Sequence, residues 1–139
     1  MREIEVEVGG IVARAVLFED RAPRTCAKVL GLLPLEDRTI HVRWSGAAWR
    51  TEKNYPLQLD AIENPVTILG GGDIIYYDDG PRNLFKIGVA YGPAAWRDFE
   101  GDIQVAHIGR ISANLEAFTR TCDRIIFEGP KIVRIRCAG

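Results

Sequence analysis

The residues of this 139-residue chain best suited to chemistry lie between positions 45 and 56, where two aromatic rings flank an arginine. Trp49, Arg50 and Tyr55 belong to a stretch without a sustained hydrophobic period. Such a stretch predicts a long loop, and long ordered loops in compact domains are often functional. A guanidinium beside two rings can clamp a carboxylate or an amide carbonyl while a ring stacks on the planar face of the ligand. The alternative is that both rings cover one end of the fold and that Arg50 is solvated.

His41 and Arg43 form a second candidate pair on one face of the predicted strand 38–44. The opposite, apolar face of that strand consists of Ile40, Val42 and Trp44. If the apolar face points inward, the pair points outward, where the histidine could act as a base or a hydrogen-bond donor. The simpler alternative is a polar sheet surface.

Tyr76 and Arg110 are further candidates for ligand contact. Tyr76 and Tyr77 occupy opposite faces of one predicted strand, so one is expected in the core and the other at the surface, and Tyr76 is preferred. Arg110 follows Gly109, where a close approach of the backbone is expected. His107 has no second His or Cys at ligand spacing, so the sequence predicts no metal site.

The sequence indicates no cofactor. The Gly70-Gly71-Gly72 run precedes a strand and therefore lacks the helix N-terminus that phosphate-binding loops use. The three cysteines, Cys26, Cys122 and Cys137, are far apart and contain no Cys-x-x-Cys spacing. This pattern argues against a disulfide framework and a structural zinc site, and we expect small buried hydrophobes.

Composition limits the classes of partner. The chain has 18 basic and 19 acidic residues, a formal net charge of -1, and no block of like charge. Neither a nucleic acid nor a membrane surface is therefore expected as a partner. No apolar run approaches the roughly 20 residues of a transmembrane helix, and the chain opens directly on an alternating strand. We expect a single cytoplasmic domain over residues 1–139.

The elements that must position these residues are mostly strands. The predicted strands are 3–8, 11–18, 38–44, 66–69, 73–77, 84–91, 104–111 and 131–137. One predicted helix begins near Pro23 and ends before Pro34, and a second carries an apolar stripe over 115–122. A sheet of about eight strands tends to close on itself, which removes its edges. We predict a mainly β fold: a closed eight-stranded barrel with two short α-helices capping its ends.

Three segments resemble known proteins. Residues 17–25, LFEDRAPRT, resemble the strand-to-helix junction of cyclophilins, where an Ala-Pro-x-Thr segment opens the first helix. Residues 72–77, GDIIYY, and 109–111, GRI, resemble cyclophilin-like families of bacterial and archaeal proteins of unknown function. The order of elements agrees over nearly the whole chain, which implies a cyclophilin-like barrel. Residues 41–50 keep an arginine but lack the hydrophobic and glutamine partners of the cyclophilin catalytic site.

Three functions follow as hypotheses. The first is binding of, and action on, a small planar molecule with an amide or carboxylate group, held by Trp49, Arg50 and Tyr55. The second is prolyl cis-trans isomerisation, in which an arginine in a dry pocket lowers a barrier of ~20 kcal/mol. The third is protein interaction or homo-oligomerisation, with Trp96 and Phe99 as exposed anchors of a homodimer.

Overall fold

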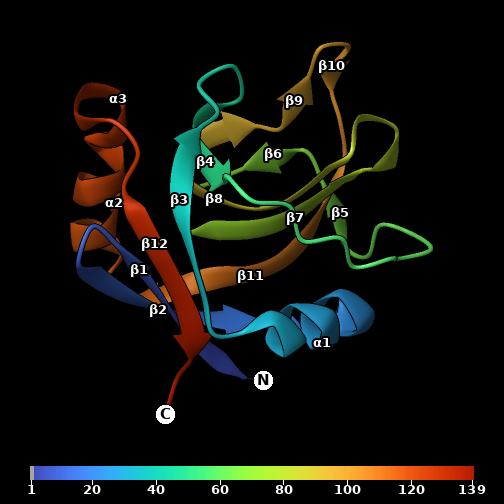
Figure 1. Ribbon diagram of the computed structural model, residues 1–139, viewed down its shortest axis with the longest axis horizontal. Helices are drawn as coiled ribbons and strands as arrows, with labels where there is room; N and C mark the ends of the chain where they lie inside the picture. Colours follow the sequence, from blue (N-terminus) through green and yellow to red (C-terminus); the bar gives the residue numbers. More distant parts are fainter. Residues whose placement is uncertain (1) are drawn as a thin grey trace.

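Eight antiparallel strands close into a barrel in the computed structural model, which describes residues 2–139 (Figure 1). These strands are β1 (Glu3–Val8), β2 (Ile11–Leu17), β3 (Leu35–His41), β4 (Gly46–Thr51), β7 (Asp73–Asp79), β8 (Leu84–Ala95), β11 (Val105–Ala113) and β12 (Ile132–Cys137). Their order around the barrel is β2-β1-β12-β3-β4-β8-β7-β11, and β11 pairs again with β2 to complete the ring. The predicted closed eight-stranded barrel is confirmed.

The first hairpin shows how the sequence sets the two faces of the barrel. On β1 the apolar residues Ile4, Val6 and Val8 are buried, while the alternating glutamates face outward. Gly9 and Gly10 adopt φ angles of 57° and 86°, which a tight turn between antiparallel strands requires. Period-two alternation thus places one face of the hairpin in the core and the other in water.

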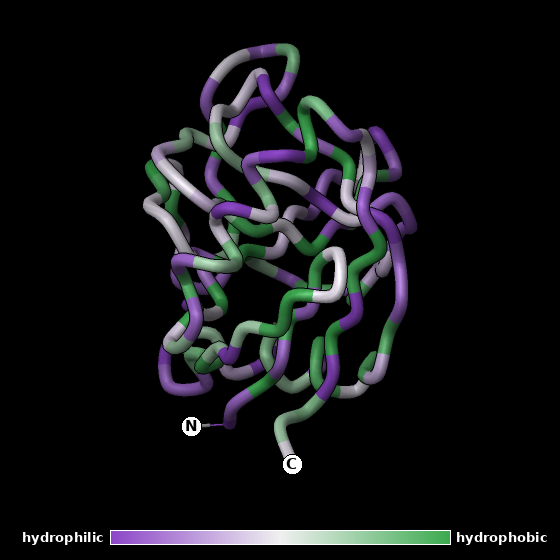
Figure 2. Tube along the Cα trace, turned by 90° about the vertical axis from the view of Figure 1, so that its left-hand side faces the viewer, coloured by the Kyte–Doolittle hydropathy of each residue, from purple (hydrophilic) through white to green (hydrophobic). Residues whose placement is uncertain are grey.

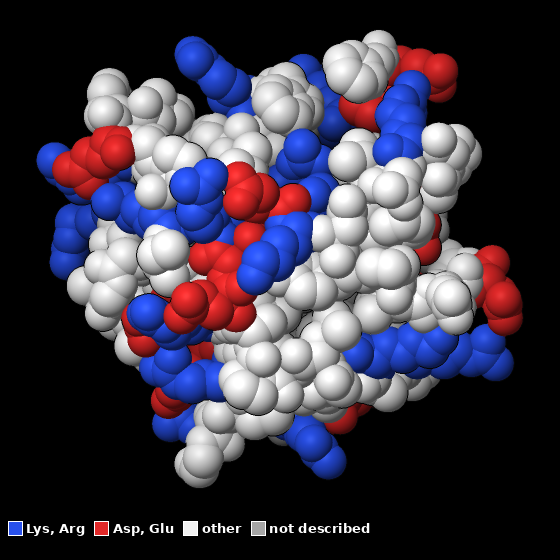
Figure 3. All heavy atoms as spheres, viewed as in Figure 1, with Lys and Arg blue, Asp and Glu red and all other residues white. Residues whose placement is uncertain are grey.

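Ion pairs cover the outer face of the neighbouring strands. Glutamates of β1 and β3 pair with arginines of β12, as in the Arg134 Nη1 to Glu7 Oε2 contact of 2.8 Å and the Arg134 Nε to Glu36 Oε1 contact of 2.7 Å. Figure 3 shows acidic and basic side chains interleaved on the face that β3 and β12 cross in Figure 1. This part of the surface is charged but nearly balanced.

Helices pack on two sides of the barrel. They are α1 (Pro23–Leu32), α2 (Leu115–Asp123) and the single turn α3 (Ile125–Glu128), and α1 lies far from the α2–α3 pair in Figure 1. Cys26 and Val29 of α1, and Phe118 and Cys122 of α2, join the barrel core. The two predicted helices are confirmed. No helix among residues 2–139 is long and apolar enough to cross a membrane.

Large side chains fill the barrel interior. Trp49, Tyr76, Ile108 and Phe118 come from four different elements and are each at most 2% exposed. Hydropathy alternates in short stretches along the trace, as expected for strands that each contribute one face to this interior (Figure 2).

A second apolar cluster lies outside the barrel, over β4, β8 and β7. Its members include Ile75, Tyr77, Ala90 and Trp96. Short elements frame it: β5 (Pro65–Val66), β6 (Ile68–Leu69), the 3₁₀ turn η1 (Gly80–Arg82), β9 (Arg97–Asp98) and β10 (Gly101–Asp102). β6 pairs with the end of β8, and β9 and β10 form a separate two-stranded sheet.

Two sequence predictions are wrong in this region. The third strand is Leu35–His41 rather than 38–44, and residues 46–51, predicted to be part of a long loop, form β4. β4 is rich in small residues with weak strand preference, and its pairing with β3 and β8 on both sides overrides that local preference. Gly46 is needed where the chain enters β4, since a Cβ there would lie 2.8 Å from the Pro93 carbonyl oxygen.

The predicted faces of the third strand are also reversed. Thr39 is fully buried, and His41 contacts Tyr91 of the barrel core, whereas Val42 joins the outer cluster. Trp44 lies beyond the strand, in the turn to β4, and is 53% exposed. Side chains alternate along a strand, so an assignment that is off by one residue places every side chain on the wrong face. The prediction extended the strand to Trp44 and took its inward face from that end.

Candidate functional site

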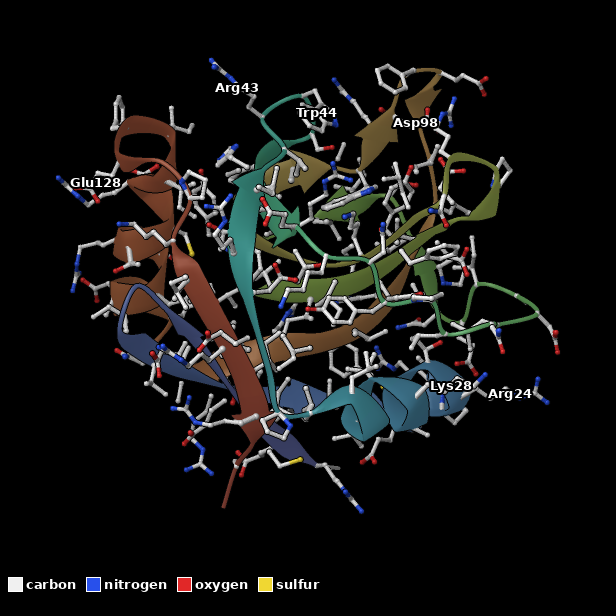
Figure 4. The ribbon with its side chains drawn as sticks, viewed as in Figure 1. Arg24, Lys28, Arg43, Trp44, Asp98 and Glu128 are labelled. Atoms are coloured by element: carbon white, nitrogen blue, oxygen red, sulfur yellow. The ribbon has the colours of Figure 1, made fainter. Side chains whose placement is uncertain are left out.

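A cavity of about 390 Å³ opens on the outer cluster. Its walls come from β4, β7, β8, η1, the turn after β3 and the β9–β10 hairpin, and consist of Val42, Trp44, Arg50, Tyr77, Arg82, Leu84, Trp96, Arg97, Asp98 and Phe99. Figure 4 shows Trp44 and Asp98 on two neighbouring projections at the same edge of the molecule. The cavity is therefore an apolar hollow whose rim is formed by two chain reversals.

Gly88 allows the inner wall of the cavity to form. Trp96 crosses over β8 and is only 2% exposed, and a Cβ at position 88 would lie 2.7 Å from its Cη2 atom. The indole ring therefore occupies the space that any other residue at position 88 would fill. Tyr77 lies beside it, with 6.0 Å between the ring centroids. Together these two rings, whose planes are inclined by 57°, form the inner wall of the cavity.

Arg50 extends into this cavity without a partner of opposite charge. Its neighbours on the sheet are Ile40 of β3 and Gly88 of β8, neither of which can pair with a guanidinium. The Nε atom is buried and has no hydrogen-bond partner, and no carboxylate within residues 2–139 pairs with the side chain. Burial accordingly lowers the pKa of Arg50 from its ordinary value. An arginine remains charged at neutral pH, so this is a half-buried, uncompensated positive charge.

The other two guanidinium groups of the cavity wall do have partners. Arg82 contacts Asp79 at 3.0 Å and Asp98 at 3.3 Å, and Glu100 lies 3.7 Å away. Its guanidinium also lies 5.6 Å from the centre of the Phe99 ring, within cation–π range. Arg97 Nε lies 2.6 Å from Asp102 Oδ1. The cavity thus combines one free cation with a rim of paired charges.

Comparisons with known proteins place the chain in a family. Residues 4–137 match a family model described as protein of unknown function (DUF3830). The chain belongs to the DUF3830 family. No curated protein sequence matches it significantly.

Two solved structures share the fold of this DUF3830 chain. One is McbB, described in complex with tryptophan, with a TM-score of 0.73 and 23% identity over 98% of the DUF3830 chain. The DUF3830 chain spans only 45% of the McbB chain. The other is the hypothetical protein AF2241 from Archaeoglobus fulgidus, with a TM-score of 0.63 and 18% identity, covering 99% of this chain and 95% of that one. Identities this low establish a shared fold.

Of the five residues predicted to contact a ligand, only Arg50 lines the cavity of the DUF3830 chain. Trp49, its neighbour on β4, points to the opposite face, is fully buried, and donates from Nε1 to Cys122 Sγ at 3.2 Å. Tyr55 donates from its hydroxyl to Asp37 Oδ2 at 2.6 Å and packs against the barrel core. The predicted clamp of one arginine between Trp49 and Tyr55 is therefore wrong, because successive residues of a strand, such as Trp49 and Arg50, face opposite ways.

Tyr76 and Arg110 lie outside the cavity. Tyr76 is in the barrel interior, where its hydroxyl donates to the Tyr55 carbonyl oxygen at 2.6 Å, and it is Tyr77 that lines the cavity. Both tyrosines are buried, so the expectation that one is exposed is wrong: β7 is covered on both faces. Arg110 pairs with the buried Asp73 at 2.8 Å, which also contacts His107 at 3.1 Å. These three residues form a local ion-pair cluster.

His41 and Arg43 are also separated from the cavity lining. His41 Nε2 lies 2.5 Å from the Tyr91 hydroxyl, and burial together with the charge of Arg43 lowers the pKa of His41. Arg43 is exposed in the turn after β3. No group of His, Cys, Asp or Glu side chains within the described part of the chain is placed to hold a metal ion.

Trp96 and Phe99, predicted as exposed dimer anchors, both line the cavity instead. Trp96 is buried within its own chain, so it cannot serve as an exposed anchor, whereas Phe99 is 92% exposed. The homodimer itself stays a prediction.

Sequence reasoning missed the cavity residues Val42, Trp44, Tyr77, Arg82, Leu84, Arg97 and Asp98. The available signal was that residues 73–77 and 84–91 are apolar on both faces, which indicates strands covered on both sides.

Proposed function

We propose that this DUF3830 protein binds a small planar molecule with a carboxylate or amide group in the outer cavity, anchored by Arg50. The observation that carries the proposal is the uncompensated guanidinium of Arg50. Burying a charged group without a partner is costly, so such a group is retained where it serves something other than stability. A ligand with oxygen acceptors would supply the missing partner, and two parallel hydrogen bonds from the guanidinium would fix its orientation.

The remaining walls suit a flat body attached to that polar group. Tyr77 and Trp96, which are 6% and 2% exposed, form the inner wall beside Arg50, while Trp44 and Phe99 are exposed at the rim and become buried if a ring enters between them. A concave, mainly aromatic hollow with a few convergent polar groups is the usual form of a small-molecule site. Its volume of about 390 Å³ lies within the range of known ligand pockets.

Two likenesses support the proposal. McbB, described in complex with tryptophan, shares the fold, and tryptophan has a planar aromatic ring and a carboxylate. The resemblance of the sequence to cyclophilin-like proteins also favours a site on the outer face of the barrel, where cyclophilins hold their substrate. The polar group and the ring proposed for the ligand of this chain are the features that Arg50 and Trp96 would recognise.

A thermal-shift screen of small planar carboxylates, amides and imides tests the proposal. A ligand that binds only the folded state raises the melting temperature by mass action. At a ligand concentration 100 times its Kd, the free energy of unfolding rises by about 2.7 kcal/mol. We expect several compounds to raise the melting temperature of the wild type and none to raise that of Arg50→Met. Equal shifts in both proteins, or no shift in either, would refute the proposal.

Prolyl isomerisation is the second candidate function, favoured by one observation. The guanidinium of Arg50 lines an apolar hollow on the outer barrel face, and one of its N–H groups could bond to a prolyl amide nitrogen as the peptide bond twists. A proline-peptide assay separates the two candidates. Acceleration above the spontaneous rate that is lost in Arg50→Met supports isomerisation. A rate equal to the background removes it and leaves the binding proposal unaffected.

A further inference from the structure

The charge balance of the cavity wall narrows the class of ligand. Three guanidinium groups line the hollow, and two of them already have carboxylate partners: Arg82 with Asp79, Asp98 and Glu100, and Arg97 with Asp102. Only Arg50 lacks one, among the residues that the structure describes. The cavity therefore has one uncompensated positive charge, located on β4.

The rim at η1 and the β9–β10 hairpin carries an excess of negative charge. Asp79 and Asp98 share the single guanidinium of Arg82, and their side chains are only 11% and 12% exposed. Asp98 itself lines the cavity, at the start of the β9–β10 hairpin. A second negative charge on a ligand would be placed near this rim, where like charges repel at reduced dielectric.

We infer that the cavity selects an aromatic monocarboxylate over the matching neutral amide and over a matching dianion, an inference that rests on the proposed function. A carboxylate neutralises Arg50 and accepts two of its N–H groups, whereas an amide offers one oxygen acceptor and no charge. A dianion would satisfy Arg50 equally well but would bring its second charge toward Asp98. The selection thus combines attraction of the ligand carboxylate by Arg50 with repulsion of a second negative charge by Asp98.

The inference can be tested with three ligands that share one ring system. They are 1-naphthylacetate, 1-naphthylacetamide and 5-(carboxymethyl)-1-naphthoate, a dicarboxylate that carries its second negative charge on the other ring, away from the acetate group. Isothermal titration of the whole chain at pH 8 and fixed low salt should give the tightest binding for the acetate. We expect the amide to bind at least tenfold more weakly, since a hydrogen bond to a charged group contributes about 1.5–3 kcal/mol. We expect the dicarboxylate to bind several-fold more weakly than the acetate.

A rim variant tests the repulsive half of the inference. Asp98→Asn keeps the size of the side chain and removes its charge, so it should improve binding of the dicarboxylate relative to the acetate by about two- to fivefold, the range of a partly exposed charge pair. Glu116→Gln, on the far side of the barrel and 90% exposed, is the matched control and should leave the ratio unchanged. Circular dichroism melts establish that Asp98→Asn is folded, because Asp98 also contacts Arg82.

The outcomes separate this inference from the proposed function. If the amide binds as well as the acetate, or the dicarboxylate binds more tightly, the charge selection is wrong while the cavity remains a binding site. An unchanged dicarboxylate-to-acetate ratio in a folded Asp98→Asn variant overturns the role of the rim. If none of the three compounds binds, or if all bind Arg50→Met as they bind the wild type, the proposed function itself fails.

Discussion

Replacing Arg50 by methionine should stabilise this protein while abolishing ligand binding. Methionine keeps the unbranched apolar stem that packs at the cavity wall and removes the guanidinium. The buried Nε has no hydrogen-bond partner, and such a group costs about 1–3 kcal/mol. We expect Arg50→Met to gain about 1–2 kcal/mol, since the rest of the guanidinium is only half-buried. For a domain of this size each kcal/mol corresponds to about 3 °C, so the melting temperature should rise by about 3–6 °C.

The assay is thermal unfolding of the ligand-free proteins at one pH and one concentration. Arg97→Met is the matched control, because this side chain lines the same cavity but is paired with Asp102 and 51% exposed, and its loss should change stability by less than about 0.5 kcal/mol. A melting temperature of Arg50→Met that falls below both the wild type and Arg97→Met would refute the reasoning. It would mean that the guanidinium stabilises the fold and needs no ligand to explain it.

Three further predictions test the packing and the electrostatics around this site. Gly88→Ala should destabilise the protein by about 2 kcal/mol or more in urea unfolding, because the added Cβ would meet Trp96 Cη2 at 2.7 Å. In the same assay Gly31→Ala in α1 should stabilise the protein by about 0.5–1 kcal/mol, because its Cβ would meet nothing within 4 Å. Thiol titration with an aromatic disulfide at pH 8 should modify only Cys137 in the native protein and all three cysteines in urea, since burial raises the pKa of Cys26 and Cys122 to about 12 while Cys137 is exposed. Hydrogen bonds from Arg124 and Lys131 lower the pKa of Glu128 from 4.5 to about 2, so the stability from this group is complete above pH 4.5 and is lost as the pH falls toward 2. Glu128→Gln should therefore flatten that acid limb in melts recorded from pH 6 to pH 2, and an unchanged slope would contradict the assignment.

The sequence predicted the barrel because most of its strands carry their own signal. Glu3–Val8 alternates cleanly and is followed by two glycines, and the hairpin of β7 and β8 is rich in β-branched and aromatic residues. Each of these patterns is local, so no knowledge of partner strands is needed to interpret it. Three cysteines were expected in the core, and two lie there, while Cys137 is exposed near the end of β12.

The cavity could not be predicted because non-local pairing creates it. β4 is a strand only through its contacts with β3 and β8, and once it is a strand, Trp49 and Arg50 must point in opposite directions. β8 was predicted to end at Tyr91, before Gly92-Pro93, but it continues to Ala95 by pairing with β6 and with Gly46. That extension carries Trp96 back over Gly88, a contact that no sequence pattern indicates.

The filled barrel interior explains why the cavity lies on the outside of the barrel. An eight-stranded barrel has an interior that side chains just fill, and here Trp49, Tyr76 and Phe118 meet within it. The outer face of β4, β8 and β7 carries small residues such as Gly88 and Ala90, which leave room for Trp96 and the hairpin that follows it. The residues that define the cavity therefore belong mainly to the turns and short strands outside the barrel. Substitutions in those segments should therefore change the shape of the cavity without disturbing the core, whereas Arg50, which lies on a barrel strand, keeps its position.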